Sequence, residues 1–255
     1  MKNKFFVIVP VLNEVENLDK LYTSVFQLKE EFANFDLVFI LVDDGSTDGT
    51  AKRATELSKG LTFVLLSHEK NLGPGKAFAT AFAYLENKLS SEDWVMTIEG
   101  DNTSKLELVK QMFVRTKEGY EVILASPYMY GGGVTNTTTF RVILSQVANA
   151  IIKEFIGIHG ILTMSSFFRL YSGNSIIALQ KYYGPKIIER NGFESMIELL
   201  HKMIYLKLTI SEVAMVLDSS LRKGKSKMKI MKTIFGYLTI FSEKKKWFEA
   251  ILKIK

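Results

Sequence analysis

The sequence contains no cysteine. This absence excludes disulfide-stabilised folds, zinc sites built from thiolates and enzymes with a cysteine nucleophile. It fits a reducing compartment, and we expect a cytoplasmic protein. Long hydrophobic runs are absent as well, because no stretch reaches the roughly 18 consecutive apolar residues that a membrane-spanning helix needs. The short apolar run at residues 5–9 ends at Pro10 without a small-residue cleavage site, which indicates a strand rather than a signal peptide.

The composition is that of a globular protein with one sizeable core. Of the 255 residues, 47% are hydrophobic and 24% are charged, which excludes a disordered chain. The sequence has no internal repeat and no low-complexity linker. We therefore expect one domain over residues 1–228, followed by a tail over residues 229–255.

The positive charge is concentrated at the C-terminal end. Residues 222–255 carry 11 basic and two acidic side chains, a net charge of +9, whereas the other 221 residues have a net charge of −3. Such a segment indicates an anionic partner, either a phosphate-bearing substrate, nucleic acid or a membrane surface, unless it is only a solvated face. The spacing of Ile230, Ile234, Leu238 and Phe241 is amphipathic, and Trp247 and Phe248 extend this apolar stripe. We therefore expect the tail either to contact an anionic membrane face peripherally or to pack on the domain.

Strand and helix patterns alternate over the first half of the sequence. Apolar runs typical of strands cover residues 5–9, 37–42, 61–67, 94–99 and 121–126. Helical spacing fills the intervals between them, which predicts an α/β fold with a mostly parallel sheet flanked by helices. In the second half we expect a helix over roughly 140–156, a helix after Gly192, a strand within 208–217 and a helical C-terminal appendage.

Two acidic clusters stand at predicted strand ends, where open α/β sheets bind their ligands. Asp43-Asp44 follows an apolar strand, so we expect at least one carboxylate to face the crevice and accept a hydrogen bond from a base or a ribose. Glu99-Gly100-Asp101 places two carboxylates one residue apart, with a glycine that leaves space for a close ligand. Hard oxygen ligands at this spacing suit Mg²⁺ or Mn²⁺ bridging the phosphates of a nucleotide.

The glycine-bearing turn at residues 71–76 does not indicate a dinucleotide or P-loop site. It lacks the G-x-G-x-x-G and the G-x-x-x-x-G-K-[ST] spacings, and it follows the third strand rather than the first.

Taken together, the motifs resemble those of a known enzyme family. They are V-I-V-P-V-L-N-E, V-D-D-G-S-T-D-G-T, N-L-G-P-G-K-A, the acidic pair at 99–101 and a late G-K-S-K-M. The series resembles the family 2 glycosyltransferases of the GT-A fold, and within them the dolichol- and polyprenyl-phosphate sugar synthases, including mannose synthases. The resemblance covers residues 5–228 and implies a Rossmann-like GT-A domain that transfers a hexose from a nucleotide sugar.

The resemblance implies a role for individual residues. Residues at the nucleotide site would be Pro10, Leu12, Glu14, Val42, Asp44 and Gly100. Glu99 and Asp101 would bind the metal, and the catalytic set would be Asp101, Arg222 and Lys227, of which the two basic residues bind the diphosphate. Arg141, Ser145 and Asn149 match polar residues of an acceptor site, and their spacing puts them on one helix face, although a solvated polar stripe has the same spacing.

The implied reaction moves a sugar from a UDP- or GDP-linked donor to a lipid phosphate, with Mg²⁺ or Mn²⁺ as cofactor. Two alternatives are a glycosyltransferase that acts on a saccharide hydroxyl and a non-catalytic module that binds nucleotide sugars or nucleic acid. We expect no nucleic-acid partner, because the basic tail lacks the interleaved aromatics of a stacking platform. The sequence departs from the family pattern in having Glu99 for the usual aspartate and Pro127 for a frequent arginine, so it does not define the sugar or the acceptor.

Overall fold

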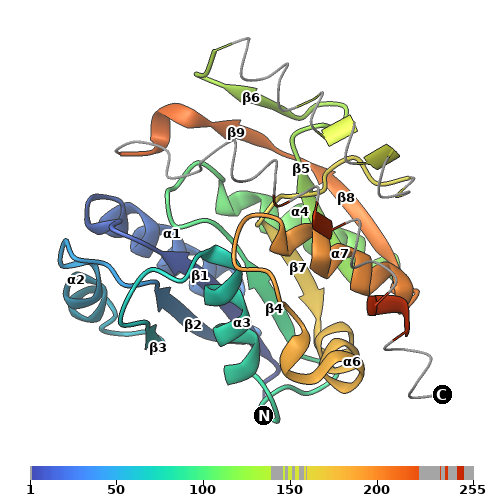
Figure 1. Cartoon of the computed structure of the whole chain (residues 1–255). Helices are drawn as coiled ribbons and strands as arrows, with labels where there is room; N and C mark the ends of the chain where they lie inside the picture. The colour runs from blue at the N-terminus through green and yellow to red at the C-terminus, as the bar shows by residue number, and fades with distance from the viewer. Residues whose placement is uncertain are drawn as a thin grey trace.

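Seven strands form one twisted sheet at the centre of the molecule (Figure 1). The computed structural model describes residues 2–138, 146, 149–150, 153–154, 158, 160–223, 236, 239–240 and 246–249. Within them the sheet has the order β3-β2-β1-β4-β7-β5-β8. Its strands are β1 (Lys4–Val11), β2 (Asp36–Asp43), β3 (Thr62–Ser67), β4 (Trp94–Thr97), β5 (Val122–Ser126), β7 (Arg169–Ser172) and β8 (Ile210–Ala214).

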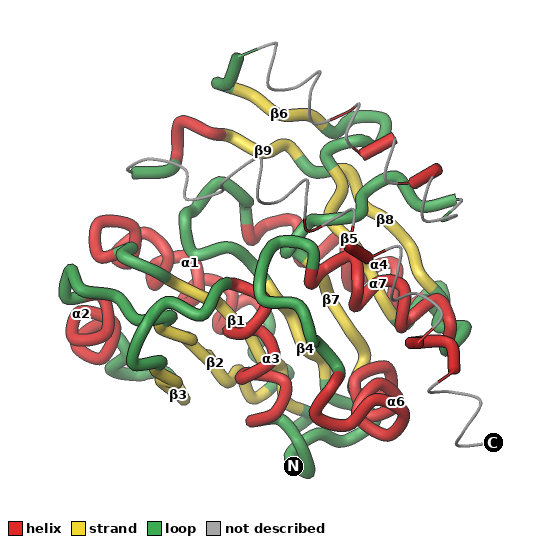
Figure 2. Tube along the Cα trace, in the orientation of Figure 1, coloured by secondary structure: helices red, strands yellow, loops and turns green. Residues whose placement is uncertain are grey.

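Helices cover both faces of this sheet (Figures 1 and 2). They are α1 (Leu18–Glu31), α2 (Thr50–Leu57), α3 (Pro74–Tyr84), α4 (Val109–Lys117), α6 (Gly173–Tyr183) and α7 (Ser195–Tyr205), with short 3₁₀ turns η1 (Val15–Asn17), η2 (Leu106–Leu108), η3 (Gly184–Lys186) and η4 (Ser219–Leu221). Alternate side chains of β1 point to opposite faces: Phe5 and Val7 pack with α1, α2 and α4, whereas Phe6 and Ile8 pack with α3, α6 and α7. The predicted α/β architecture is confirmed.

All strand pairs of the large sheet are parallel except the two that involve β7. β7 lies between β4 and β5 and runs antiparallel to both. The sequence analysis missed it, because four residues beginning with an arginine show no apolar run. The Arg169 guanidinium is fully buried and donates to the carbonyls of Met164 (2.8 Å), Ser166 (2.7 Å) and Met196 (3.0 Å). Helix α6, which follows β7 directly, was missed with it.

A small second sheet lies beyond one end of the large one. It pairs β6 (Gly133–Thr135) with β9 (Val216–Asp218) in parallel, and Figure 2 shows the two side by side. The single strand predicted within 208–217 is therefore two strands. They separate at Met215, whose N–H donates to Ser126 O (2.9 Å) and whose carbonyl accepts from Gly133 N (3.0 Å).

The described part of the C-terminal segment packs on the domain. Ile240 and Trp247 are buried in the core that covers the α3, α6 and α7 face of the sheet. The Trp247 indole N–H donates to Glu189 (3.2 Å), and its backbone carbonyl accepts from the Tyr183 hydroxyl (3.3 Å). Ile230, Ile234, Leu238 and Phe241 of the predicted apolar stripe lie outside the described residues. Within the described part of the chain, no helix is both long and apolar enough to span a membrane.

The burial of Trp247 leads to a stability prediction. We expect Trp247→Ala to lower the free energy of unfolding by about 3–5 kcal/mol, because the change opens a cavity beside α6 and α7 and removes the indole N–H that donates to Glu189. The neighbouring Phe248 is 47% exposed, so Phe248→Ala is a matched control that should cost at most about 1 kcal/mol. Urea unfolding of both variants measures the difference, and equal losses would contradict the packing of this segment.

Candidate functional site

Two loops at the carboxyl edge of the sheet are joined by hydrogen bonds. One follows β1 and contains Leu12 and Glu14, and the other follows β2 and carries the D-D-G-S-T-D-G-T motif. The bonds are Asn13 N to Ser46 Oγ (2.8 Å), Thr47 N to Asn13 Oδ1 (2.8 Å), Glu14 N to Thr50 Oγ1 (2.9 Å) and Val15 N to Asp48 Oδ2 (3.2 Å). The sequence analysis gave Ser46, Asp48 and Thr50 no role at the site, but they hold the loop that carries the predicted nucleotide residues.

Asp44 is buried, with 4% of its surface exposed. Its Oδ1 accepts from the Leu72 amide (2.9 Å) and lies 2.7 Å from His68 Nδ1, and its Oδ2 accepts from the Gly73 amide (2.8 Å). The other ring nitrogen of His68 lies 2.9 Å from Thr80 Oγ1. Asp44 therefore holds the glycine-bearing turn in place. We expected one carboxylate of the Asp43-Asp44 pair to face the crevice, but both are buried, and Asp43 accepts from Ser46 N (3.0 Å).

The glycine-bearing turn is fixed from its other side as well. Gly73 has φ +98°, and a Cβ at this position would lie 2.3 Å from the Asn191 carbonyl oxygen. The same carbonyl accepts from Gly75 N (2.8 Å). Only glycine fits such a conformation at such a distance, so the turn is enclosed between Asp44 and the segment that precedes α7.

Glu99 lies just beyond β4, half-buried and beside Asp101. Its carboxylate accepts from Ser104 Oγ (3.2 Å) and from Phe167 N (3.4 Å). Burial, followed by the charge of Asp101, raises the pKa of Glu99 to about 7. A cation bound here would favour the charged form of the carboxylate.

Asp101 is bound to a residue 121 positions later in the sequence. Its Oδ1 accepts from Thr103 N (3.1 Å) and Thr103 Oγ1 (2.7 Å), and its Oδ2 accepts from Arg222 Nε (2.7 Å) and forms an ion pair with the same guanidinium. The structure thus brings together two members of the predicted catalytic set. Between the two acidic residues, Gly100 packs against the end of β1, because a Cβ there would lie 2.7 Å from Val11 Cγ1. The glycine therefore makes room for β1, where we expected it to make room for a ligand.

The acidic pair fits a divalent cation that also binds a phosphate. Among the residues that the structure describes, no three His, Cys, Asp or Glu side chains gather into a metal cluster of their own. Mg²⁺ and Mn²⁺ commonly take one or two carboxylates and complete their shell with phosphate oxygens and water. Glu99 and Asp101 supply such a donor set, provided that Asp101 exchanges Arg222 for the ion.

The remaining predicted residues differ in what they can contact. Pro10 pairs with Val42 across β1 and β2, and Leu12 and Glu14 are half-buried in the loop that follows. The Val42 side chain is fully buried in the core, so only its backbone can face the edge of the sheet. Asn149 donates from Nδ2 to Leu162 O (2.6 Å), whereas Arg141, Ser145 and Lys227 lie outside the described residues.

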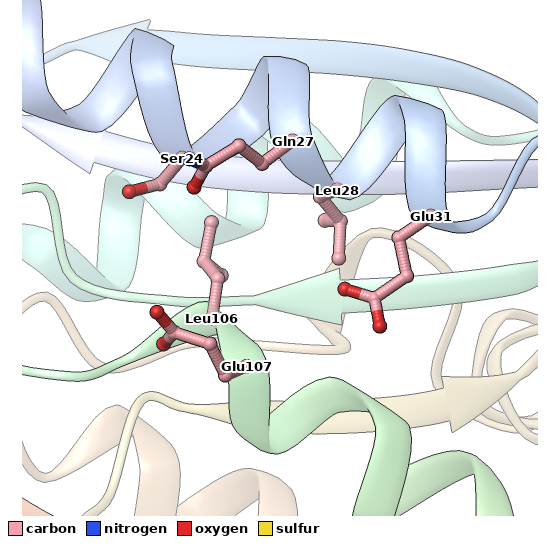
Figure 3. A pocket seen from close by; sticks show the side chains of 6 residues that line it. All are labelled: Ser24, Gln27, Leu28, Glu31, Leu106 and Glu107. Atoms are coloured by element: carbon pink, nitrogen blue, oxygen red, sulfur yellow. The ribbon is translucent and has the colours of Figure 1, made fainter.

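A small pocket lies away from these residues, between α1 and η2 (Figure 3). It is lined by Ser24, Gln27, Leu28, Glu31, Leu106 and Glu107. None of the predicted site residues contributes to it, so the candidate site is the loop edge described above.

Comparison with known proteins identifies the family. The family model described as glycosyl transferase family 2 matches residues 6–176, which include most of β1, the strands β2 to β7 and both acidic clusters. The chain belongs to glycosyl transferase family 2. The family resemblance of the sequence motifs is confirmed.

Two curated relatives act on lipid phosphates according to their names. The chain is 30% identical over 250 residues to a dolichol-phosphate mannosyltransferase of Pyrococcus furiosus, covering 96% of this chain and 64% of that protein. It is 29% identical over 163 residues to the undecaprenyl-phosphate 4-deoxy-4-formamido-L-arabinose transferase of Proteus mirabilis, covering 61% of this chain and 45% of that protein. The chain therefore spans less than two thirds of the length of both relatives.

Solved structures share the fold. S. aureus TarS 1–349 in complex with UDP-GlcNAc superimposes with a TM-score of 0.57 at 21% identity, over 99% of this chain and 72% of that one. The mannosyltransferase PcManGT from Pyrobaculum calidifontis, in complex with GDP-Man and Mn²⁺, gives a TM-score of 0.52 at 12% identity, over 99% and 74%. The predicted GT-A fold is confirmed.

The bonds of Asp44 lead to a prediction about the glycine-bearing turn. Asp44→Asn puts an NH₂ group against the N–H of either Leu72 or Gly73, so we expect a loss of about 1–3 kcal/mol in unfolding free energy. Asp36→Asn removes the same charge from the exposed start of β2 and should leave the stability unchanged. Thermal unfolding of the pair decides the matter, since an unaffected Asp44→Asn variant would contradict the role of this carboxylate.

Proposed function

We propose that this chain transfers a sugar from a UDP- or GDP-linked donor to a polyprenyl phosphate, with Mg²⁺ or Mn²⁺ as cofactor. The observation that carries the proposal is the meeting of Glu99, Asp101 and Arg222 at the carboxyl edge of the sheet. A nucleoside diphosphate needs carboxylates that can hold a cation and a cationic side chain that can bind a phosphate. Glu99 and Asp101 supply the first, and Arg222 supplies the second. Family membership supports this interpretation.

The nucleoside would lie over the ends of β1 and β2. Pro10, Leu12 and Glu14 belong to the loop that the D-D-G-S-T-D-G-T segment holds in place, so their positions are fixed before a ligand arrives. Asp44 would act by fixing the turn at residues 71–73 beside the base. A preformed site of this kind lowers the ordering cost of binding.

The chemistry would consist mainly of stabilising negative charge on the departing nucleoside diphosphate. Glu99 and Asp101 would hold a divalent cation, which would supply positive charge next to the leaving group. Arg222 would bind the same diphosphate, and Lys227, from the following segment, would contribute a second positive charge to it. Positive groups held in place before the reaction need no reorganisation as the charge develops, which is the usual source of such catalysis.

The proposed acceptor is a lipid phosphate, as the names of both curated relatives suggest. A phosphate oxygen is already ionised near pH 7, so the attacking group needs no general base. Arg141, Ser145 and Asn149 are the candidates to bind this phosphate. With an acceptor embedded in a membrane, the basic C-terminal segment would work beside an anionic surface on the cytoplasmic side.

The proposal is tested by incubating the protein with UDP- and GDP-linked sugars, Mn²⁺ and either a polyprenyl phosphate or a soluble oligosaccharide. Sugar recovered on the lipid phosphate is the expected result. Transfer to the oligosaccharide alone would replace the proposed acceptor with a saccharide hydroxyl, and release of no nucleoside diphosphate from any donor would overturn the proposal.

Asp101 provides the sharpest test of the mechanism. Asp101→Asn removes a charge from the metal and diphosphate site, so we expect turnover to fall at least about 100-fold while the melting temperature stays within a few degrees. Glu107→Gln removes a charge from an exposed position of the same loop region and should retain full turnover. Wild-type turnover in the Asp101 variant would refute the metal role.

Metal and nucleotide should also bind cooperatively. Because Arg222 occupies one oxygen of Asp101, Mn²⁺ alone has to displace the guanidinium, whereas a diphosphate offers Arg222 another partner and the ion further ligands. We expect UDP or GDP, whichever binds, to raise the Mn²⁺ affinity about tenfold or more in calorimetric titrations. Equal Mn²⁺ affinity with and without the nucleotide would speak against a shared site.

A further inference from the structure

We propose that Asn17 is a positioning residue that holds the segment Asp218–Lys223 against the site, so that Arg222 meets Asp101. The inference rests on the proposed function for its consequence in catalysis, although the contacts stand independently of it. Asn17 ends the turn η1, directly before α1, and only 2% of its surface is exposed.

The Asn17 side chain binds both backbone groups of one residue. Its Oδ1 accepts from Lys223 N (3.0 Å), and its Nδ2 donates to Lys223 O (3.2 Å) and to Glu14 Oε2 (2.5 Å). The two bonds to Lys223 reproduce the exchange that a residue of a neighbouring β-strand would make. Since 206 positions separate the two residues, only the folded chain brings this side chain and this backbone together.

The backbone of Asn17 is itself fixed to two loops of the site. Its N–H donates to Glu14 O (2.8 Å), and its carbonyl accepts from Asn102 Nδ2 (2.9 Å). Asn102 directly follows Asp101 and has a left-handed backbone with φ 61°. Asn17 therefore connects the loop after β1, the acidic loop after β4 and the segment that carries Arg222.

The other end of that segment is held separately. Asp218 N donates to Thr103 O (3.1 Å), so the acidic loop binds the chain four residues before Arg222. With Asp218 and Lys223 both fixed, the backbone between them has little freedom, and the Arg222 side chain is directed at Asp101. Without Asn17, the second of these attachments is lost, and Arg222 is held only by the attachment at Asp218 and by its own ion pair with Asp101.

Loss of the Asn17 side chain should not unfold the protein. Lys223 is exposed, so water can satisfy its N–H and carbonyl once the asparagine is gone. The effect is therefore expected in the position of the segment rather than in global stability. This distinguishes Asn17 from Asp44, whose partners are enclosed.

Limited proteolysis tests the attachment without any substrate. Trypsin cleaves after Arg222 and Lys223, and we expect these two bonds to be cut at least five times faster in Asn17→Ala than in the wild type, with the sites before Asp218 unchanged. Asn3→Ala, which alters an exposed asparagine at the opposite edge of the sheet, is the matched control and should match the wild type. Equal cleavage rates in Asn17→Ala and wild type would overturn the proposal.

A second measurement needs no variant and so does not depend on Asn17→Ala folding. In hydrogen–deuterium exchange of the wild-type protein, the Lys223 amide should exchange at least tenfold more slowly than an unstructured amide. Exchange at the unstructured rate would contradict the Asn17–Lys223 bond.

The kinetic consequence is measured with the transferase assay. For Asn17→Ala we expect kcat/KM for the nucleotide sugar to fall about tenfold at an unchanged melting temperature. The double variant Asn17→Ala/Arg222→Gln should have the same kcat/KM as Arg222→Gln alone. Independent, multiplying losses would mean that Asn17 does not act through Arg222. Should no donor be turned over, the proposed function fails, while the proteolysis and exchange results still decide the role of Asn17.

Discussion

Backbone amides and carbonyls at the carboxyl edge of the sheet lie in loops, where no ladder satisfies their hydrogen bonds. Buried backbone polar groups left without partners cost free energy, so each loop has to find partners in another. Here short polar side chains supply them: Ser46 and Thr50 bind the loop after β1, Asp44 binds the turn before α3, and Asn17 binds Lys223. The shape of the candidate site depends on these bonds, because they connect segments that are distant in sequence.

The charges at the site are balanced by the chain itself. Glu99 and Asp101 lie together at the carboxyl edge of the sheet, where burial and then the charge of Asp101 raise the pKa of Glu99. Arg222 offsets this repulsion by binding Asp101. A nucleoside diphosphate with its cation brings both a positive partner for the acids and a negative partner for the arginine. Binding can then exchange one set of ion pairs for another, which avoids leaving a charge unpaired in a partly desolvated site.

The C-terminal segment is structurally connected to the same edge. Trp247 binds Glu189, and the nearby Glu198 carboxylate accepts from the amides of Glu189 and Arg190 while it pairs with the buried Lys202. Asn191, which follows Arg190, has the backbone carbonyl that accepts a hydrogen bond from Gly75 N in the turn held by Asp44. A continuous set of packed and hydrogen-bonded groups therefore runs from the tail to the predicted nucleotide loops. Lys246 of the tail adds to this packing, because its ammonium group donates to Glu189 (2.9 Å).

The sequence by itself determined the alternation of strands and helices in the first half, the GT-A resemblance and the acidic residues 99–101, because apolar runs and short motifs are local and can be recognised without knowledge of the fold. The tertiary structure decided what the sequence could not. β7 was missed because its buried arginine is solvated by carbonyls from three separate positions, which no local pattern reveals. The bonds from Asp44 to a turn 28 residues away were not foreseen either. The pairing of Asp101 with Arg222 and of Asn17 with Lys223 spans 121 and 206 positions. No local pattern encodes such contacts, because they depend on where the sheet brings its loop ends together.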